Sequence, residues 1–396
     1  MLAFIIAPLY LAVNILFMID LLRQLSKLCG LFKKQIIRTV ICILYAIPSL
    51  SPLTAFLVTQ EPYQRILKFT ESYWLGAGLY LVMGMVFFGI IRLIVHFTVK
   101  NTRIRKIASY SAVYSAAAAI IVSSFGTLHA YNIKIHRSEF EIDKHCGISE
   151  MNIALIADFH LGYSVGYEHM QQTVDKVNAQ SPDLVIIAGD IFNNEFDALN
   201  NPEKTAEILS GLKSTYGTYA CWGNHDVAEK ILSGFTFKND NLQKDKRFDD
   251  FLEKADIRLL SDESVLIDNS FYIVGRNDAS RSRKLGEDRL SPSKLLSGLD
   301  TEKPVFVIDH QPSQLEELAE CGADIDFSGH THNGQIFPAN IAVKFFWENP
   351  YGVLKKYAAN GKYMYSCVTS GAGIWGPAMR VGTDSEILML KVKFKE

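Results

Sequence analysis

The fold of the C-terminal part of the chain can be read from Leu184-Val185-Ile186-Ile187-Ala188-Gly189-Asp190. Five apolar residues in a row predict a strand that is buried on both faces, and a glycine and an aspartate follow at its end. The same order recurs at four other places, where a short apolar segment ends in residues that can bind a metal ion. Because sites in α/β folds gather at the carboxyl ends of strands, the recurrence predicts one α/β domain with its site at that edge.

The four other strand ends carry Asp158-Phe159-His160, Gly223-Asn224-His225-Asp226, Asp309-His310 and Ser328-Gly329-His330-Thr331-His332. From these loops, two aspartates, one asparagine and four histidines make a mixed oxygen and nitrogen set of candidate ligands. Such a set suits Mn²⁺, Fe, Zn²⁺ or Mg²⁺ rather than a structural thiolate site. Seven side chains are too many for one ion and fit two, which can share a carboxylate and hold a phosphoryl group for in-line attack.

The rest of the C-terminal part alternates in the same way between strand-like and helix-like segments. The predicted strands are 153–157, 184–188, 218–222, 271–274 and 305–308, with 325–327 before the double-histidine motif. The predicted helices are 168–180, 202–213, 248–255 and 313–321. A net charge of −2 gives no reason to expect nucleic acid as a partner, and six cysteines are too few for a disulfide scaffold.

The near-neutral charge and the mean hydropathy of +0.10 average over two unlike regions. Residues 1–131 hold twelve lysines and arginines against three acidic residues, a net charge of +9, whereas the remainder has a net charge of −11. Four apolar runs, 2–19, 36–58, 73–97 and 107–128, are each close to the roughly 20 residues that a membrane-spanning helix needs. We therefore expect a four-helix transmembrane region over 1–131, a linker or entry strand over 132–149 and a catalytic domain over 150–396.

The links between the apolar runs predict the orientation of the chain. The first link carries Arg23, Lys27, Lys33 and Lys34, and the third carries Lys100, Arg103, Arg105 and Lys106. Because lysine and arginine favour the cytoplasmic side, both links are expected inside the cell. With four spans, the C-terminal domain of this multi-pass membrane protein lies outside the cytoplasm. If the fourth run, which is rich in serine and alanine, does not span, the domain lies inside.

The ordered motifs resemble those of the calcineurin-like metallophosphoesterase superfamily over about residues 150–396. Within it, the chain looks most like a bacterial branch of phosphodiesterase type with membrane-anchored or exported members. The similarity extends to Gly334-Gln335-Ile336, Ser370–Pro377, Arg380-Val381-Gly382 and Ser385-Glu386-Ile387. Asn333 departs from that branch, where glycine is commoner, but it is not a ligand position.

The resemblance implies a four-layer α/β/β/α sandwich and a particular division of the ligands. One divalent ion would take Asp158, His160, Asp190 and His332, and the other Asp190, Asn224, His310 and His330, with Asp190 bridging. A hydroxide between the ions would be the nucleophile, since metal coordination lowers the pKa of water. His225 would protonate the leaving oxygen or stabilise the transferred phosphoryl group. Asp226 would orient His225, or else cap its own loop.

Other residues have weaker claims to a role. Arg276 and Arg380 are candidates for binding a substrate phosphate, because arginine pairs with phosphate in bidentate fashion. For Arg276 a solvated surface loop is the alternative. Asp309 either supports His310 or faces solvent. Trp222 and Trp375 are expected in the core, with the walls of a pocket as the alternative.

These features predict a membrane-anchored phosphoesterase with two metal ions that hydrolyses a phosphodiester or pyrophosphate bond. The anchor makes a lipid or another component of the cell envelope a candidate substrate. A phosphomonoesterase of broad specificity is the alternative. A non-catalytic sensor or scaffold is the third reading, and the presence of all seven ligands speaks against it.

Overall fold

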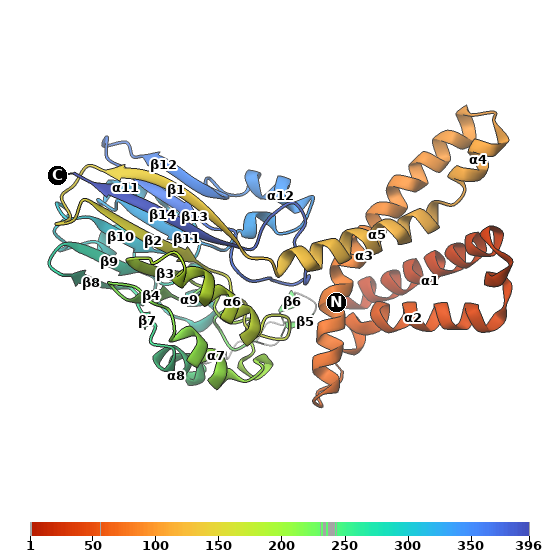
Figure 1. The fold of residues 1–396 in the computed structure, drawn as a ribbon, viewed down its shortest axis with the longest axis horizontal. Coiled ribbons are helices and arrows are strands. Elements are labelled where there is room, and N and C mark those ends of the chain that lie inside the picture. The colour runs from red at the N-terminus through yellow and green to blue at the C-terminus, as the bar shows by residue number, and fades with distance from the viewer. Residues whose placement is uncertain are drawn as a thin grey trace. The chain divides into compact units, whose positions relative to one another are not determined.

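A computed structural model describes residues 2–55, 57–229, 231–232, 235–236, 242 and 244–395 (Figure 1). The chain divides into two compact units, one with the N-terminal helices and one with the sheets. The helical unit contains α1 (Leu2–Leu28), η1 (Gly30–Lys33), α2 (Gln35–Thr54), α3 (Tyr63–Thr98), α4 (Thr102–Ala108) and α5 (Ser111–Ala130), the last of which ends in the second unit.

Four of these helices, α1, α2, α3 and α5, are long and apolar enough to cross a membrane. Large apolar side chains on them face outward: Leu16, Leu44 and Ile121 are each about two-thirds exposed. A soluble helical bundle would bury such residues, so their exposure is typical of helices whose surroundings are lipid. The prediction of four apolar helices long enough to span a membrane is confirmed, and these helices indicate association with a membrane.

The helices are longer than the apolar runs that predicted them. α3 begins at Tyr63, ten residues before the apolar run at Tyr73, and α1 continues past Ile19 to Leu28. Polar residues at the end of a spanning helix can remain helical in the headgroup region, so hydropathy marks the apolar part of a helix rather than its ends. Pro48 and Pro52 lie inside α2, as proline can in a spanning helix.

The second unit is built on two six-stranded sheets. The first has the order β1-β14-β2-β3-β4-β7 and the second β12-β13-β11-β10-β9-β8. The first sheet consists of β1 (Lys134–Ile142), β14 (Glu386–Phe394), β2 (Glu150–Ile156), β3 (Leu184–Ala188), β4 (Thr218–Cys221) and β7 (Arg258–Leu259). The second consists of β12 (Gly352–Tyr357), β13 (Tyr363–Val368), β11 (Ile325–Ser328), β10 (Val305–Ile308), β9 (Phe271–Gly275) and β8 (Glu263–Ile267). A separate pair joins β5 (Ile231–Leu232) and β6 (Phe235–Thr236).

Alternation along the strands creates the layers of the domain. In β2, Ile153 and Leu155 face the core between the two sheets, whereas Ala154 and Ile156 face the core under the helices on the outer side. Successive side chains of a strand point to opposite faces, so a strand that is apolar at every position must be covered twice. Helices α6, α7 and α8 cover the first sheet, and α10 and α11 cover the second. The predicted four-layer α/β/β/α sandwich is confirmed.

The remaining elements lie on or between these layers. The helices are α6 (Tyr167–Asn178), α7 (Pro202–Leu209), α8 (Lys246–Lys254), α9 (Ala279–Leu285), α10 (Pro292–Leu295), α11 (Leu315–Glu320) and α12 (Ala339–Ala342). Short 3₁₀ turns are η2 (Phe196–Ala198), η3 (His332–Gly334) and η4 (Val343–Phe345). The predicted strands match the observed ones within three residues, and the four predicted helices within four.

Strand direction brings the five motif loops to one edge. β2, β3 and β4 run parallel to one another in the first sheet, and β9, β10, β11 and β13 do so in the second. The carboxyl ends of β2, β3, β4, β10 and β11 carry the predicted metal ligands. β1, which lies in the stretch predicted as a linker or entry strand, pairs in parallel with β14 at the edge of the first sheet.

Candidate metal centre

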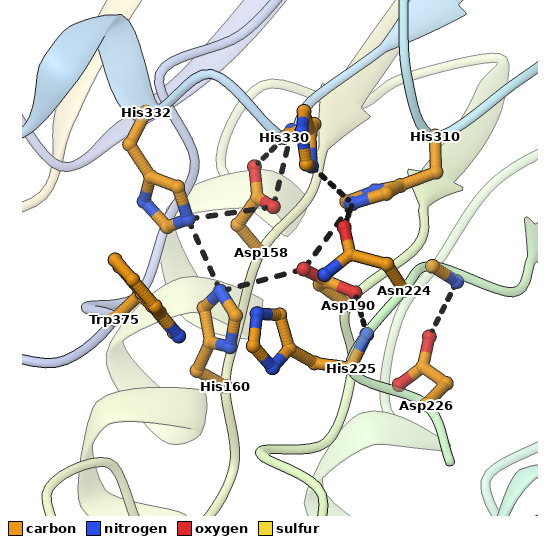
Figure 2. A network of polar contacts seen from close by, with 12 residues as sticks. Asp158, His160, Asp190, Asn224, His225, Asp226, His310, His330, His332 and Trp375 are labelled. Carbon is orange, nitrogen blue, oxygen red and sulfur yellow. Dashed lines mark hydrogen bonds and ion pairs between the residues drawn. The ribbon is translucent and has the colours of Figure 1, made fainter. Parts of the chain in front are cut away.

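The strand ends bring all seven predicted ligands into one cluster (Figure 2). Two groups of three have donor atoms within 4.8 Å of one another, close enough to hold an ion each. The first is Asp158, His160 and His332, and the second is Asp190, His310 and His330. All are buried except His330, which is half-buried. Segments up to 174 residues apart in sequence, from Asp158 to His332, therefore supply one cluster of donors.

In the first group, two imidazoles point their nitrogens at the same space. His160 Nε2 lies 3.1 Å from His332 Nε2, and His332 Nε2 lies 3.6 Å from Asp158 Oδ1. Two ring nitrogens at this distance have room for one proton or one cation between them. A carboxylate beside them makes a divalent cation the better fit.

The second group has Asn224 and His330 on either side of His310. His310 Nε2 lies 3.0 Å from Asn224 Oδ1 and 3.2 Å from His330 Nδ1. The other ring nitrogen of His310 is 2.9 Å from the Ala188 carbonyl. A carbonyl can only accept a hydrogen bond, so Nδ1 carries the proton, and in the neutral ring Nε2 offers its lone pair as a ligand atom.

Asp190 lies between the two groups. Its Oδ2 is 3.2 Å from His310 Nε2 and 3.7 Å from His160 Nε2, so one oxygen faces a histidine of each group. Its other oxygen accepts the backbone N–H of His225 at 2.7 Å. This hydrogen bond fixes the carboxylate with Oδ2 toward the histidines. The geometry is that of a carboxylate able to bridge two ions.

The backbone of the site is unusual for residues other than glycine. Asp158, His160, Asp190, His330 and His332 adopt φ values between 49° and 66°. This left-handed region is sparsely populated by side-chain-bearing residues, and it persists where the surrounding structure enforces it. Here it turns each loop sharply after its strand and directs the side chain over the sheet edge. Five such residues in one cluster mark it as functional.

Two glycines make room for the carboxylates. A Cβ at Gly223 would stand 2.2 Å from Asp190 Oδ1, and one at Gly329 would stand 2.5 Å from Asp158 Oδ2. Any larger residue at either position would displace the carboxylate from the cluster. The glycines in the two motifs are therefore required by the close approach of neighbouring loops.

The charges in the cluster are incompletely balanced by protein groups. Burial, with a contribution from the Asp190 carboxylate, raises the pKa of Asp158 to about 8. Burial alone would raise the pKa of Asp190, but His310 and His225 hold it well below its ordinary value. Among the described residues, neither aspartate forms an ion pair with a lysine or arginine.

The histidines complete the case for a cation. Burial lowers the pKa of His160 and of His330 to about 3, which keeps both rings neutral and their lone pairs available. Neutral imidazoles and buried carboxylates are the forms in which these side chains bind metals. The residues present therefore fit divalent metal ions, in agreement with the prediction from the motifs.

His225 is positioned by a residue that the sequence did not reveal. Its Nδ1 lies 2.5 Å from Oδ1 of Asn194, and the Asn194 amide nitrogen donates in turn to the Val227 carbonyl. The His225 ring packs beside His160, with centroids 5.2 Å apart. Asn194 lies four residues beyond the Gly189-Asp190 motif, where no pattern marks it. It therefore takes the orienting role expected of Asp226.

Asp226 caps the loop instead. Its carboxylate accepts the backbone N–H groups of Phe192 at 2.8 Å and Gly223 at 2.7 Å, and in Figure 2 it lies apart from the His225 ring. Burial and the nearby Asp190 raise its pKa to about 7. Of the two readings of Asp226, the hydrogen bonds support the loop cap and not the orientation of His225, because both carboxylate oxygens hold the loop that carries Asn224 and His225.

The two arginines predicted to bind substrate lie below the surface. Arg276 is 1% exposed and donates a hydrogen bond to Asp309 at 3.1 Å. Arg289 donates to the same oxygen, so two arginines balance the charge of this buried aspartate. Arg380 is fully buried and donates to the carbonyls of Ser370, Gly371 and Gly373. The Nη groups of both arginines donate hydrogen bonds inside the protein, so neither side chain is placed for the predicted contact with substrate.

Two tryptophans border the cluster. Trp375 is 37% exposed and its ring lies 5.6 Å from that of His225, which corrects the expectation that it is in the core. Trp347 lies 5.1 Å from the ring of His330. Trp222 is buried as expected. The rim of the site is therefore partly aromatic, a feature that the spacing of the motifs could not show.

Comparison with known proteins shows which family the sequence of this domain resembles. Residues 151–334 match the model of the calcineurin-like phosphoesterases. An uncharacterised metallophosphoesterase of Helicobacter pylori is 32% identical over 250 residues, which cover 61% of this chain and 60% of that protein. The chain thus matches about three-fifths of the length of this relative.

Two further relatives differ in source and in name. A transmembrane protein with metallophosphoesterase domain from Danio rerio is 28% identical over 62% of this chain and 54% of its own length. The UDP-2,3-diacylglucosamine pyrophosphatase LpxG of Chlamydia trachomatis is 24% identical over 47% of this chain and 64% of its own.

The two groups of donors predict the metal content. After chelation and reloading with Mn²⁺, the full chain should retain about two ions per molecule by elemental analysis, because each group can hold one. His160→Ala and His330→Ala should each retain about one. His145, an exposed histidine outside the cluster, provides the control, and His145→Ala should retain the wild-type content. A wild-type content of one ion or fewer would contradict the assignment.

The Asn194–His225 hydrogen bond predicts a second effect. Asn194 has φ +65°, so Asn194→Gly removes the side chain without backbone strain, and Asn194→Asp keeps the accepting oxygen. The glycine variant should lower kcat for a phosphoester by about 10- to 100-fold, and the aspartate variant should retain most of it. Metal content should be unchanged in both. Equal losses in kcat for the two variants would count against an orienting role.

Proposed function

Because residues 151–334 match the model of the calcineurin-like phosphoesterases, we propose that this chain is a phosphoric ester hydrolase that cleaves a phosphodiester or pyrophosphate bond with two metal ions. The observation that carries the proposal is the Asp190 carboxylate, with one oxygen facing a histidine of each donor group. Two such ions, when bound, would activate a water molecule as nucleophile and neutralise charge on the phosphoryl group.

Seven residues would bind the two ions, and His225 would transfer a proton. Asp158, His160 and His332 hold one ion, Asn224, His310 and His330 hold the other, and Asp190 is shared. His225 lies beside the first group, where it can give a proton to the leaving oxygen opposite the attacking water. Asn194 Oδ1 beside His225 Nδ1 fixes the orientation of the ring. Phe192 and Gly223, held by Asp226, keep the loop in place.

The charges around the site favour a substrate with one negative charge on the attacked phosphorus. A phosphate monoester carries nearly two negative charges at neutral pH, and its extra charge is usually met by a free arginine or lysine. In the part of the chain that the structure describes, Arg276, Arg281 and Arg289 near the site already pair with carboxylates. Lys284 pairs with Glu229 in the same way. This pairing supports a diester or disubstituted pyrophosphate over a monoester.

The preference between esters can be measured directly. The full chain with Mn²⁺ should cleave bis(p-nitrophenyl) phosphate with a kcat/KM about tenfold or more above that for p-nitrophenyl phosphate, because only the diester matches the available charge. Asp190→Asn should abolish most of the activity toward both. A preference for the monoester would indicate a phosphomonoesterase of broad specificity. No difference between the wild type and Asp190→Asn would refute a hydrolytic role for the cluster.

The membrane helices suggest where the substrate is found. With basic links after α1 and after α3, we propose that the amino terminus and the catalytic domain lie outside the cytoplasm. An enzyme held at the outer surface would meet lipids and other components of the envelope. The relative LpxG, a UDP-2,3-diacylglucosamine pyrophosphatase, supports a substrate that combines lipid and phosphoryl groups.

The proposed topology gives a test that does not depend on activity. Alkaline phosphatase fused after Glu396 should be active in intact bacterial cells, because that reporter folds only outside the cytoplasm. Green fluorescent protein at the same position should be dark when exported. The opposite pair of signals would place the domain inside and show that the helix α5 does not complete a fourth span.

A further inference from the structure

Three large apolar side chains project from the segment between β11 and β12, residues 329–351, which also carries His330 and His332. Phe345 is 84% exposed, Phe346 is 79% exposed and Ile341 is 52% exposed. They lie on α12, on η4 and directly after it, within thirteen or so residues of His332. A group of large apolar side chains this exposed marks a surface that binds a membrane or another protein. We call residues 341–346 the aromatic tip.

The strand register places the aromatic tip at the metal-bearing end of the second sheet. Ser328 at the end of β11 pairs with Val368 of β13, and Gly352 at the start of β12 pairs with the same Val368. The chain therefore leaves and re-enters the sheet at one end, and residues 329–351 all belong to that end. Figure 1 shows α12 beyond this end of the strands. His330 and His332 lie in the same segment.

The chain arriving from the last membrane helix enters the domain at the same end. Lys134, the first residue of β1, pairs with Glu386 of β14, and Leu388 of β14 pairs with Leu155 of β2, three residues before Asp158. Only three residues separate α5 from β1, a span of roughly 10 Å when extended. The metal-bearing end is thus tied to the end of an apolar helix by a very short connection.

The residues of this connection pack against the first sheet and form hydrogen bonds with it. Ala130 and Ile133 are buried in the core of the first sheet, and the Ala130 carbonyl accepts a hydrogen bond from Ser385 at 2.6 Å. The backbone N–H of Lys134 donates to the Ser385 carbonyl at 2.8 Å. Ala130, the last residue of α5, is therefore held at the same edge of the domain from which the metal ligands project.

From these observations we propose that the aromatic tip inserts into the bilayer surface and seats the metal-bearing end of the domain on the membrane. Aromatic side chains are favoured at the interface between lipid and water, and Lys344 between the apolar residues can reach the headgroups. The occupant of the tip is thus the bilayer. The proposal goes beyond hydrolysis itself: it assigns a lipid-binding surface and makes membrane-resident phosphoesters the substrates that reach the site.

The proposal is tested by the depth of a label in the full chain, reconstituted in phosphatidylcholine nanodiscs. An environment-sensitive fluorophore is attached at Phe345→Cys, and at Ile341→Cys as a second position. The accessible cysteines Cys29, Cys42 and Cys321 are replaced by serine, and Cys146, Cys221 and Cys367 are buried. Tyr357→Cys is the matched control, since Tyr357 is 60% exposed but pairs with Tyr363 at the opposite end of β12.

Spin-labelled lipid should quench the label at positions 345 and 341 at least about twofold more than at position 357. Equal quenching at all three positions would overturn the proposal. Blue-shifted emission at 345 without quenching by lipid would also overturn it, because the tip would then be covered by protein, such as a second copy of the chain. The result does not depend on catalysis, so failure to cleave bis(p-nitrophenyl) phosphate would count against the proposed function alone.

Discussion

The carboxylate of Asp190 is the constraint on which the catalytic domain depends. One oxygen is fixed by the His225 backbone N–H, and the other faces His160 on one side and His310 on the other. A buried negative charge costs several kcal/mol unless cations meet it, and no lysine or arginine of the described chain does so. The parallel strands, the left-handed backbone after them and the glycine at position 223 all serve to place this group where metal ions can balance it.

The membrane region and the catalytic edge are linked through the order of the first sheet. β1 follows the last apolar helix and runs parallel to β14, while β14 runs antiparallel to β2. This order brings the entry point of the chain to the end of β2 that carries Asp158. A different edge strand would have put the entry point and the metal ligands at opposite ends of the sandwich. The topology of one strand therefore places the entry point of the chain and the candidate metal ligands at the same end of the first sheet.

Much of the fold could be predicted because its signals are local. β3 and β10 were predicted with their observed bounds, since fully apolar runs bounded by glycine or aspartate leave no other reading. The seven predicted metal ligands lie together because each belongs to a loop that follows a buried strand. The ends of α1 and α3 were missed, since a helix can continue past its apolar segment. Asp226 was misread because adjacency in sequence does not decide where a carboxylate points.

The sequence by itself determined the apolar helices, the strands of the sandwich and the donors of the metal centre, because periodicity and strand ends are properties of neighbouring residues. The tertiary structure alone decided which polar groups form hydrogen bonds with one another. Asn194 contacts His225 from another loop, and Asp226 accepts hydrogen bonds from backbone amides. Arg380 is buried and donates to backbone carbonyls. These pairings depend on how loops far apart in the chain fold over one another, and no spacing in the sequence records that path.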